Sequence, residues 1–510
     1  MISKVRTCGL MGIDGFMVDV QTDISNGLSS FNIVGLPDTT VKEAKERVHA
    51  AVKNTGLKFP GRKITVNLAP ANMRKEGSTY DLPIAISVLS TSGQLDSAEI
   101  EDYIYVGELA LNGDIKPVPG VLPIVISAYK NGFTKFIVPE ENADEAAVIE
   151  GASVYPARTL NEVIDHLTYQ DRIVPRVVDV EKLFNTSAMT ALDFCDVKGQ
   201  EGVKRALEIA AAGNHNILLI GSPGTGKTML AKRMATILPD LTFDEALEVT
   251  KVHSIAGTLK KDQPIITQRP FRNPHHTISA VGLSGGGSMP RPGELSLAHN
   301  GVLFLDELPE FNRNVLEVMR QPLEDNSVTI SRVNATLTYP CNIMLIASMN
   351  PCKCGYFGDP RRKCTCRPQD INSYRSRISG PLLDRIDIQT EVAAVDYEKL
   401  SSATKGEKSA DIKNRVNRTR KIQLERYHDR GIYSNSQLTA GMIDEFCRLD
   451  EAANKLLKNA FNSLGLSPRA HSRILKVART IADLEGRADI SSADVAEAIS
   501  YRSLDRKYFE

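Results

Sequence analysis

Residues 216–238, "NILLIGSPGTGKTMLAKRMATIL", place a glycine-rich loop between a short apolar strand and an amphipathic helix. The spacing Gly221-x4-Gly226-Lys227-Thr228 lets backbone amides converge on phosphate oxygens. In such a loop the lysine reaches the β- and γ-phosphates and the threonine hydroxyl binds Mg²⁺. A chance glycine-rich turn is the alternative, but the flanking strand and helix favour a phosphate site. The residues expected to hold the nucleotide are Gly221, Ser222, Pro223, Gly224, Thr225, Gly226, Lys227 and Thr228.

Two later apolar strands each end in polar residues. The strand in "GVLFLDE" (residues 301–307) ends in Asp306 and Glu307, and the strand "IMLIAS" (residues 343–348) is followed by Met349 and Asn350. Because the carboxyl ends of parallel strands meet at one edge of a sheet, these groups should lie near the phosphates. We expect Asp306 to bind Mg²⁺ with Thr228, Glu307 to polarise the attacking water and Asn350 to orient that water. A solvated acidic turn is the alternative; together the strands predict hydrolysis of ATP.

Composition and length limit the class of protein. The chain has 510 residues, 42% of them apolar and 24% charged, which is typical of a globular protein with roughly three domains. Its net charge is zero, so nucleic-acid binding would have to come from local patches. The beginning of the chain shows no signal-peptide pattern, and no apolar run is long enough for a membrane span. We expect a cytoplasmic location, where thiols stay reduced and clustered cysteines favour metal binding over disulfides.

The hydrophobic pattern changes along the chain and predicts an α/β fold. Residues 1–170 are predicted to be a mixed α/β domain, and residues 171–190 lack periodicity and are predicted to be a linker. Residues 191–395 alternate short apolar strands with longer segments, as a parallel sheet covered on both faces does. Residues 396–510 are predicted to be helical.

These motifs resemble those of a known family. The glycine-rich loop, "LFLDE", the following asparagine and "SGPLLDRID" (residues 379–387) resemble an AAA+ ATPase of the helix-2-insert clade, which includes the magnesium-chelatase ATPase subunit and the MCM helicases. Residues 25–56 and 67–86 are more specific, and by them the chain is identified as a member of the YifB/ComM family of magnesium-chelatase-like ATPases over essentially its whole length. This resemblance implies an N-terminal domain like that of Lon protease and ribosomal protein S5, an AAA+ core with a parallel sheet, and a C-terminal helical lid.

The resemblance also assigns roles to two arginines. Arg385 in "LLDRID" is similar to the arginine finger that one subunit gives to the γ-phosphate of its neighbour. Arg469 in "LSPRAHSRILKVAR" resembles the sensor-2 arginine of the lid, and Arg473 is a weaker candidate. Without the family context, each of these arginines would be read as part of a surface ion pair. The implied assembly is a homo-oligomeric ring, expected to be a hexamer.

Two insertions match elements that line the pore of ring helicases and contact DNA. Residues 269–301 lie where the clade carries its helix-2 insert, and residues 327–340 alternate around Val333 and Asn334 as a β-hairpin does. An intersubunit or merely solvated role is the alternative for each basic residue. The candidate donors to DNA phosphates are Arg269, Arg272, His275, His276, Arg291 and Arg332.

Residues 350–366, "NPCKCGYFGDPRRKCTC", contain four of the eight cysteines of the chain. Thiolates of Cys352, Cys354, Cys364 and Cys366 would complete a closed tetrahedral Zn²⁺ site, which is structural rather than catalytic. So short a loop cannot bury a core of its own, so metal would supply its stability. The cysteine pairs are more closely spaced than in the usual zinc knuckle, and unliganded or redox-active thiols are the alternative. The loop also has basic residues that could meet nucleic acid: Arg361, Arg362, Lys363 and Arg367.

Three functions follow as hypotheses. The resemblance implies a motor on DNA, acting as a helicase or in branch migration during recombination or natural transformation. A chelatase-type ATPase that remodels a protein partner for metal insertion is the main alternative. A Lon-like protease would need a Ser–Lys dyad, but Ser78 lies early in its motif, residues 120–123 lack the lysine, and Lys116 and Lys130 fall outside it. We therefore expect the N-terminal domain to bind DNA or a partner protein, or to regulate the ring, rather than cleave peptides.

Overall fold

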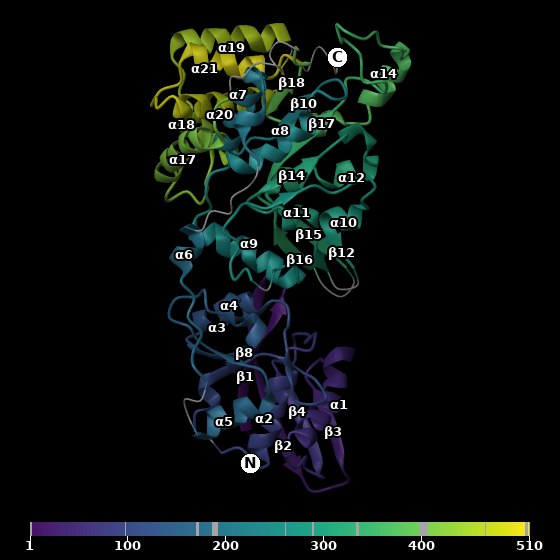
Figure 1. The fold of residues 1–510 in the computed structure, drawn as a ribbon, viewed down its shortest axis with the longest axis vertical. Coiled ribbons are helices and arrows are strands. Elements are labelled where there is room, and N and C mark those ends of the chain that lie inside the picture. The colour runs from purple at the N-terminus through teal and green to yellow at the C-terminus, as the bar shows by residue number, and fades with distance from the viewer. Residues whose placement is uncertain are drawn as a thin grey trace. The chain divides into compact units, whose positions relative to one another are not determined.

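The computed structural model describes residues 3–96, 98–169, 173–185, 192–260, 262–287, 290–332, 336–396, 406–464, 466–504 and 508. The chain forms two compact units, and each contains two segments of the sequence (Figure 1). The first unit is Met1–Ser187 with Phe243–Thr267, and the second is Ala188–Thr242 with Gln268–Glu510. Residues 243–267 lie within the predicted ATPase segment of the sequence, yet they pack with the first unit.

The first unit is built on a seven-stranded mixed sheet with strand order β3-β4-β2-β1-β5-β8-β9. Strand β2 pairs antiparallel with β1 and β4, whereas the remaining neighbours are parallel. The strands are β1 (Ser3–Met11), β2 (Asp14–Ser25), β3 (Ser30–Val34), β4 (Lys63–Ala69), β5 (Tyr103–Tyr105), β8 (Lys135–Pro139) and β9 (Ser153–Ala157), with the small hairpin β6 (Glu108–Leu109) and β7 (Ile115–Lys116).

Helices cover this sheet and close two apolar cores. They are α1 (Thr39–Asn54), α2 (Asp81–Thr91), α3 (Val121–Lys130), α4 (Ala143–Ala146) and α5 (Leu160–Tyr169). The first unit also contains α6 (Val180–Asn185) and α9 (Phe243–Ala256). Helix α9 packs against α3, where the amide of Gly120 donates to the carbonyl of Ser254 at 3.1 Å. The hydroxyl of Ser254 also donates to the buried Glu145 at 2.8 Å. These contacts explain why residues from the middle of the sequence belong to the first unit.

The second unit contains a five-stranded parallel sheet with strand order β11-β14-β17-β10-β18. The strands are β10 (Ile217–Ile220), β11 (Phe271–Arg272), β14 (Val302–Leu305), β17 (Met344–Met349) and β18 (Ile388–Glu391). Every residue of β10, β14 and β17 is buried, as expected for a parallel sheet covered on both faces. Helices α7 (Glu201–Gly213) and α8 (Lys227–Arg233) lie beside β10 (Figure 1). The predicted α/β fold class is therefore confirmed.

Several short helices and strands lie between β11 and β17 in the sequence. They are α10 (Ala280–Ser284), β12 (Gly285–Gly286), β13 (Arg291–Pro292), α11 (Glu294–Leu297), α12 (Arg313–Val318), α13 (Pro322–Asp325), β15 (Ser327–Ser331) and β16 (Thr336–Pro340). Strands β15 and β16 pair antiparallel, with Ser331 opposite Thr336; Val333 and Asn334 lie outside the described residues. The hydroxyl of Tyr339 donates to the carbonyl of Pro290 at 2.7 Å, which joins this hairpin to the segment around β12 and β13.

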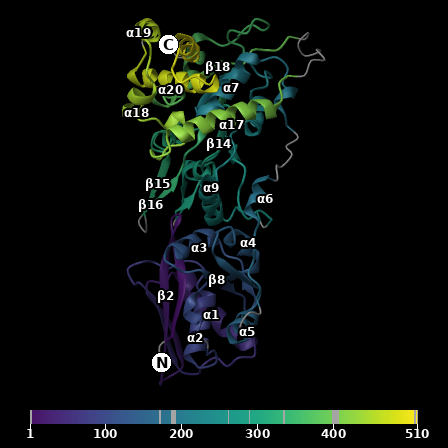
Figure 2. The same cartoon turned by 90° about the vertical axis from the view of Figure 1, so that its left-hand side faces the viewer.

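The C-terminal helices share one apolar core with the parallel sheet. They are α17 (Ser409–Arg426), α18 (Ala440–Phe446), α19 (Glu451–Leu464), α20 (Pro468–Leu484) and α21 (Ser492–Ser500). The short helices α14 (Pro368–Arg375) and α15 (Gly380–Leu383) lie between β17 and β18 in the sequence. Helix α17 packs against α7 and α20 (Figure 2). Among the described residues, no helix combines the length and apolar character that crossing a lipid bilayer requires.

Candidate active site

The glycine-rich loop lies between β10 and α8 and folds around the ammonium group of Lys227. Gly224 and Gly226 have φ angles of 80° and 92°, a left-handed conformation that glycine adopts without steric cost. The Nζ of Lys227 donates to the carbonyls of Gly221 at 2.7 Å and Ser222 at 3.0 Å. The hydroxyl of Thr225 donates to the same Ser222 carbonyl at 2.9 Å. The loop therefore holds its lysine in place through its own backbone.

The environment of Lys227 prepares it for an anion. Burial lowers the pKa of Lys227 to about 8, while the charges of Asp306 and Glu307 oppose that shift. A triphosphate would add negative charge next to this ammonium group and raise its pKa again. The site is thus arranged so that an anionic ligand stabilises the charged form of the lysine.

Asp306 and Thr228 meet where a Mg²⁺ ion would bind. The hydroxyl of Thr228 donates to Oδ2 of Asp306 at 2.7 Å, and the hydroxyl of Ser348 donates to Oδ1 of the same carboxylate. Hydroxyl and carboxylate oxygens are the ligand types that Mg²⁺ uses beside phosphates, so the donor set fits the ion. Ser348 was not among the residues predicted from the sequence, because it lies inside the apolar run of β17 and carries no signal of its own.

Asn350 and Glu307 complete this edge of the sheet. The Oδ1 of Asn350 accepts a hydrogen bond from the Nζ of Lys227 at 3.0 Å. Glu307 has a φ of 53°, and its amide donates to Oδ1 of Asp306 at 3.1 Å. Because β14, β17 and β10 are neighbours in the parallel sheet, their carboxyl ends bring these four side chains to one edge. The structure therefore groups Lys227, Asp306, Glu307 and Asn350.

Arg385 lies at the opposite edge of the same sheet. It precedes β18, and its carbonyl accepts a hydrogen bond at 2.9 Å from the side chain of Asn216, the residue before β10. The glycine-rich loop, by contrast, follows the carboxyl end of β10. The guanidinium of Arg385 is buried, donates to the carbonyl of Pro381 at 2.7 Å and pairs with Glu324 on α13. Among the described residues, its buried Nε has no hydrogen-bond partner.

Arg469 and Arg473 lie at this edge as well, but they differ in what they contact. The Nη2 of Arg469 is 3.6 Å from Glu324, and its side chain is 57% exposed. Arg473 pairs with the buried Asp387 and donates to the carbonyl of Arg385 at 3.1 Å. Burial would raise the pKa of Asp387, but the charges of Arg473 and His215 hold it well below its usual range. Both arginines line an open cavity of about 530 Å³ beside Glu324, but Arg473 also forms a buried ion pair that stabilises the protein interior.

The basic residues of the two insertions divide into two groups. Arg269 donates to the carbonyls of Pro239 at 2.7 Å and Asn300 at 2.8 Å, and Arg272 forms two hydrogen bonds with Glu294, of 2.6 and 2.7 Å. The guanidinium groups of these two arginines therefore bind other groups of the same chain. Arg291, Arg332 and His275 are exposed, and His276 stacks on His275 with ring centroids 4.1 Å apart.

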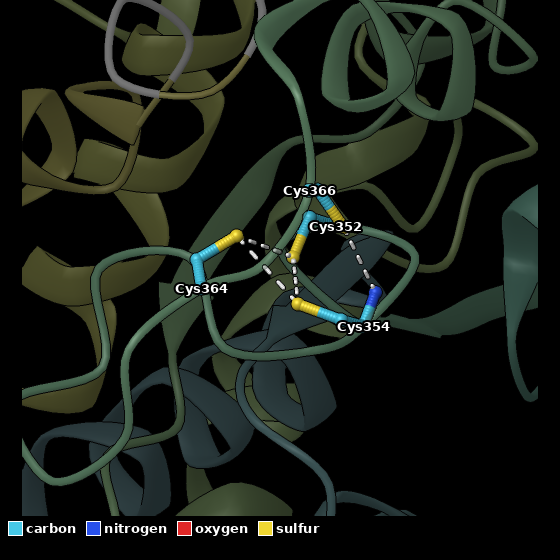
Figure 3. Close-up of side chains that lie close together, drawn as sticks. All are labelled: Cys352, Cys354, Cys364 and Cys366. Atoms are coloured by element: carbon cyan, nitrogen blue, oxygen red, sulfur yellow. Dashed lines mark hydrogen bonds between the residues drawn. The ribbon is translucent and has the colours of Figure 1, made fainter.

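The four cysteines of the loop after β17 point toward one another (Figure 3). The sulfur of Cys352 lies 3.4 Å from that of Cys354 and 3.7 Å from that of Cys364, and the last two are 3.6 Å apart. All four sulfurs, including that of Cys366, lie within 4.8 Å of one another. Four thiolates around Zn²⁺, each with a bond of about 2.3 Å, would be roughly 3.8 Å apart. The cluster therefore fits a tetrahedral ion with little movement.

In the first unit, Ser78 is not next to a lysine that could activate it. Its hydroxyl donates to the carboxylate of Glu108. Lys116 pairs with Asp114 at 3.2 Å, and Lys130 ends helix α3. A Ser–Lys dyad needs the amine within hydrogen-bond reach of the hydroxyl, and the structure pairs both Ser78 and Lys116 with carboxylates instead.

Comparisons with known proteins agree with the geometry. Three family models match along the chain: subunit ChlI of Mg-chelatase over residues 20–142, magnesium chelatase subunit ChlI over 193–400, and the C-terminal part of that subunit over 406–502. The competence protein ComM of Haemophilus influenzae is 44% identical over 97% of this chain and 96% of its own length. The uncharacterized protein YifB of Escherichia coli is 44% identical, over 99% and 98%. The magnesium-chelatase 38 kDa subunit of Rhodobacter capsulatus is 24% identical over 40% of this chain and 59% of its own length.

Proposed function

The chain belongs to the YifB/ComM family of magnesium-chelatase-like AAA+ proteins, and on that premise we propose that it is a ring-forming ATPase that remodels DNA. The observation that carries this proposal is the separation of two half-sites. Phosphate and Mg²⁺ groups lie at the carboxyl edge of the parallel sheet, and Arg385 lies at its amino edge. Neither half-site can bind and activate a triphosphate alone.

The first half-site supplies the groups for phosphoryl transfer. The backbone of residues 221–226 and Lys227 would bind the β- and γ-phosphates, and Thr228 and Asp306 would hold Mg²⁺. The ion, when bound, neutralises charge on the phosphate oxygens. Glu307 accepts the proton of the attacking water, and Asn350, next to Lys227, orients that water.

The second half-site supplies positive charge from a neighbouring copy. The strand β10 separates Arg385 from the glycine-rich loop of its own chain, so a second copy is needed to bring an arginine to the γ-phosphate. Arg469 shares Glu324 with Arg385, so both arginines would approach the same nucleotide. We therefore propose that hydrolysis depends on assembly into a closed ring, expected to be a hexamer.

DNA is the proposed substrate of this motor. The β15–β16 hairpin is joined to the segment around β12 and β13, and together they expose Arg291 and Arg332. Exposed arginines on a hairpin can contact phosphates without reading sequence. The relative from Haemophilus influenzae is named a competence protein, which supports a role in natural transformation. Branch migration or unwinding of recombination intermediates is the activity we propose.

A chelatase-type remodeller of a protein partner remains the second candidate, because the family models carry the magnesium-chelatase name. This candidate differs from a DNA motor in what stimulates ATP hydrolysis, which would be a protein instead of DNA. Proteolysis has little support, because Ser78 pairs with Glu108.

The deciding experiment measures ATP hydrolysis by the full chain with and without forked or four-way DNA. We expect severalfold stimulation by DNA and unwinding or branch migration of the same substrates. The Lys227→Ala variant should lose both activities, because the phosphates lose their main positive partner. Stimulation by a protein partner and by no DNA would favour the remodeller.

We also propose that the four-cysteine loop holds one structural Zn²⁺ ion. Metal analysis of the purified protein should find about one equivalent per chain, and the Cys352→Ser/Cys364→Ser variant should lose it. Less than about half an equivalent, with all four thiols reactive toward alkylating reagents, would favour free thiols.

A further inference from the structure

The loop closed by the four cysteines contacts the glycine-rich loop at two points. The hydroxyl of Ser222 donates to Oδ2 of Asp359 at 2.6 Å. Gly355 has a φ of 86°, and a Cβ added there would lie 2.5 Å from the side chain of Pro223, so the two loops are in close contact. Both Gly355 and Asp359 lie between Cys354 and Cys364, inside the segment that the metal would close.

Asp359 is held rigidly within its own loop. Its Oδ1 accepts hydrogen bonds from the amides of Arg361 at 2.8 Å and Arg362 at 3.1 Å. The other carboxylate oxygen is directed to Ser222. Because two amides hold the carboxylate of Asp359 in place, it keeps its hydrogen bond to Ser222. A displacement of the cysteine loop would therefore also displace Ser222.

Ser222 and Asn350 connect this loop to Lys227 from both sides. The carbonyl of Ser222 accepts from the Nζ of Lys227 at 3.0 Å, and the side chain of Asn350 accepts from the same nitrogen at 3.0 Å. Asn350 precedes Pro351 and the buried Cys352, where the loop begins. Among the described residues, the ammonium group donates to Gly221, Ser222 and Asn350. Asn350 adjoins the start of the cysteine loop, and Ser222 is hydrogen-bonded to Asp359 in the middle of that loop.

We propose that Asp359 is a positioning residue of the nucleotide site. Held by the metal-closed loop, it fixes the glycine-rich loop at Ser222 and so sets the position of Lys227 for the phosphates. This inference rests on the proposed ATP and zinc binding, and it assigns to the metal an effect on nucleotide affinity in addition to the stability of its own loop.

The test uses the full chain and the fluorescent analogue mant-ATP with Mg²⁺. We expect Asp359→Ala and Ser222→Ala each to raise the Kd about five- to tenfold, because each removes the same hydrogen bond to a charged group. The double variant should be no weaker than either single variant, since the two residues act as one pair. Asp359→Asn keeps one acceptor oxygen for the amides of Arg361 and Arg362, and its NH2 group can donate to the Ser222 hydroxyl, so it should recover most of the affinity.

Two controls separate positioning from general damage. Asp396 pairs with Arg361 of the same loop, but among the described residues it forms no hydrogen bond with Ser222. The Asp396→Ala variant should therefore bind mant-ATP as the wild type does. In steady-state kinetics, Asp359→Ala should raise KM while kcat at saturating ATP changes less than about threefold. Zinc content should stay at the wild-type value in Asp359→Ala.

Metal removal provides an independent measurement that needs no substitution. Chelation should raise the Kd of the wild type by about the same factor, and should change that of Asp359→Ala much less. Unchanged binding in Asp359→Ala, or equal binding by the metal-loaded and metal-free wild type, would overturn the inference while leaving an ATP site intact. A wild type that binds no mant-ATP would refute the proposed function instead.

Discussion

The two edges of the parallel sheet differ in what they offer to a nucleotide. At the carboxyl edge, the ammonium of Lys227 donates to Asn350, and the carboxylate of Asp306 accepts from the hydroxyls of Thr228 and Ser348 and from the amide of Glu307. At the amino edge, Arg385 and Arg469 share Glu324, and within the described part of the chain the buried Nε of Arg385 has no hydrogen-bond partner. The first edge is organised before any ligand arrives, whereas the second holds charges that a single chain cannot use. The comparison supports the proposal that the site is divided between copies, and the following experiments test that proposal.

The largest effect should come from removing the charge at the amino edge. Arg385→Ala should lower kcat about a thousandfold while leaving mant-ATP affinity nearly unchanged, because the arginine acts on a neighbour's transition state. Mixing it with Lys227→Ala should restore activity at about a quarter of the interfaces, where both groups are intact. An Arg385→Ala protein that keeps its rate, or a wild type fully active as a monomer, would contradict the divided site.

Next in size is the loss of the base at the carboxyl edge. Glu307→Gln should lower kcat at least about a hundredfold and retain ATP, because the amide cannot accept the proton of the attacking water. Asp306→Asn serves as the matched variant, and it should raise the Mg²⁺ concentration needed for binding. Equal defects in nucleotide binding for both would mean that the two carboxylates share one role.

Two of the arginines of helix α20, Arg469 and Arg473, should separate stability from catalysis. Arg473→Met leaves the buried Asp387 without the arginine that pairs with it and should cost about 3 kcal/mol in the free energy of unfolding. Arg469→Ala removes a half-exposed contact and should cost less than about 1 kcal/mol, measured by urea denaturation of both variants. We expect only Arg469→Ala to keep its stability while losing ATPase activity; the reverse pattern would exchange their roles.

The smallest effect concerns pH. The free protein holds Lys227 with a pKa of about 8, and the triphosphate favours its charged form, so binding above that pH must take up a proton. The Kd of mant-ATP should therefore be flat below pH 8 and should rise by up to about tenfold per pH unit above it. Lys227→Arg, which stays charged, should show no such rise. A flat profile for the wild type would mean that the lysine stays charged without nucleotide.

The groups at the carboxyl edge were largely predictable from sequence, because polar residues at the ends of buried strands meet when those strands are parallel. Asp306 and Asn350 follow this rule, whereas Ser348 lies inside an apolar run and gives no such signal. The arrangement at the amino edge needed the structure, since Glu324 and Arg385 are far apart in sequence. The role of Arg272 also could not be predicted from the sequence. A basic residue in an insertion was a candidate for DNA, but its partner Glu294 is defined only by the fold.

The return of residues 243–267 to the first unit has a consequence for dividing this protein into fragments. A fragment ending at residue 187 would lack α9, exposing one face of α3 to water and leaving Glu145 and Gly120 without the groups that Ser254 supplies. A fragment beginning near residue 191 would carry that helix with no surface to cover it. Neither piece is a natural folding module, so truncation studies should keep the polypeptide whole or graft α9 onto the shorter part.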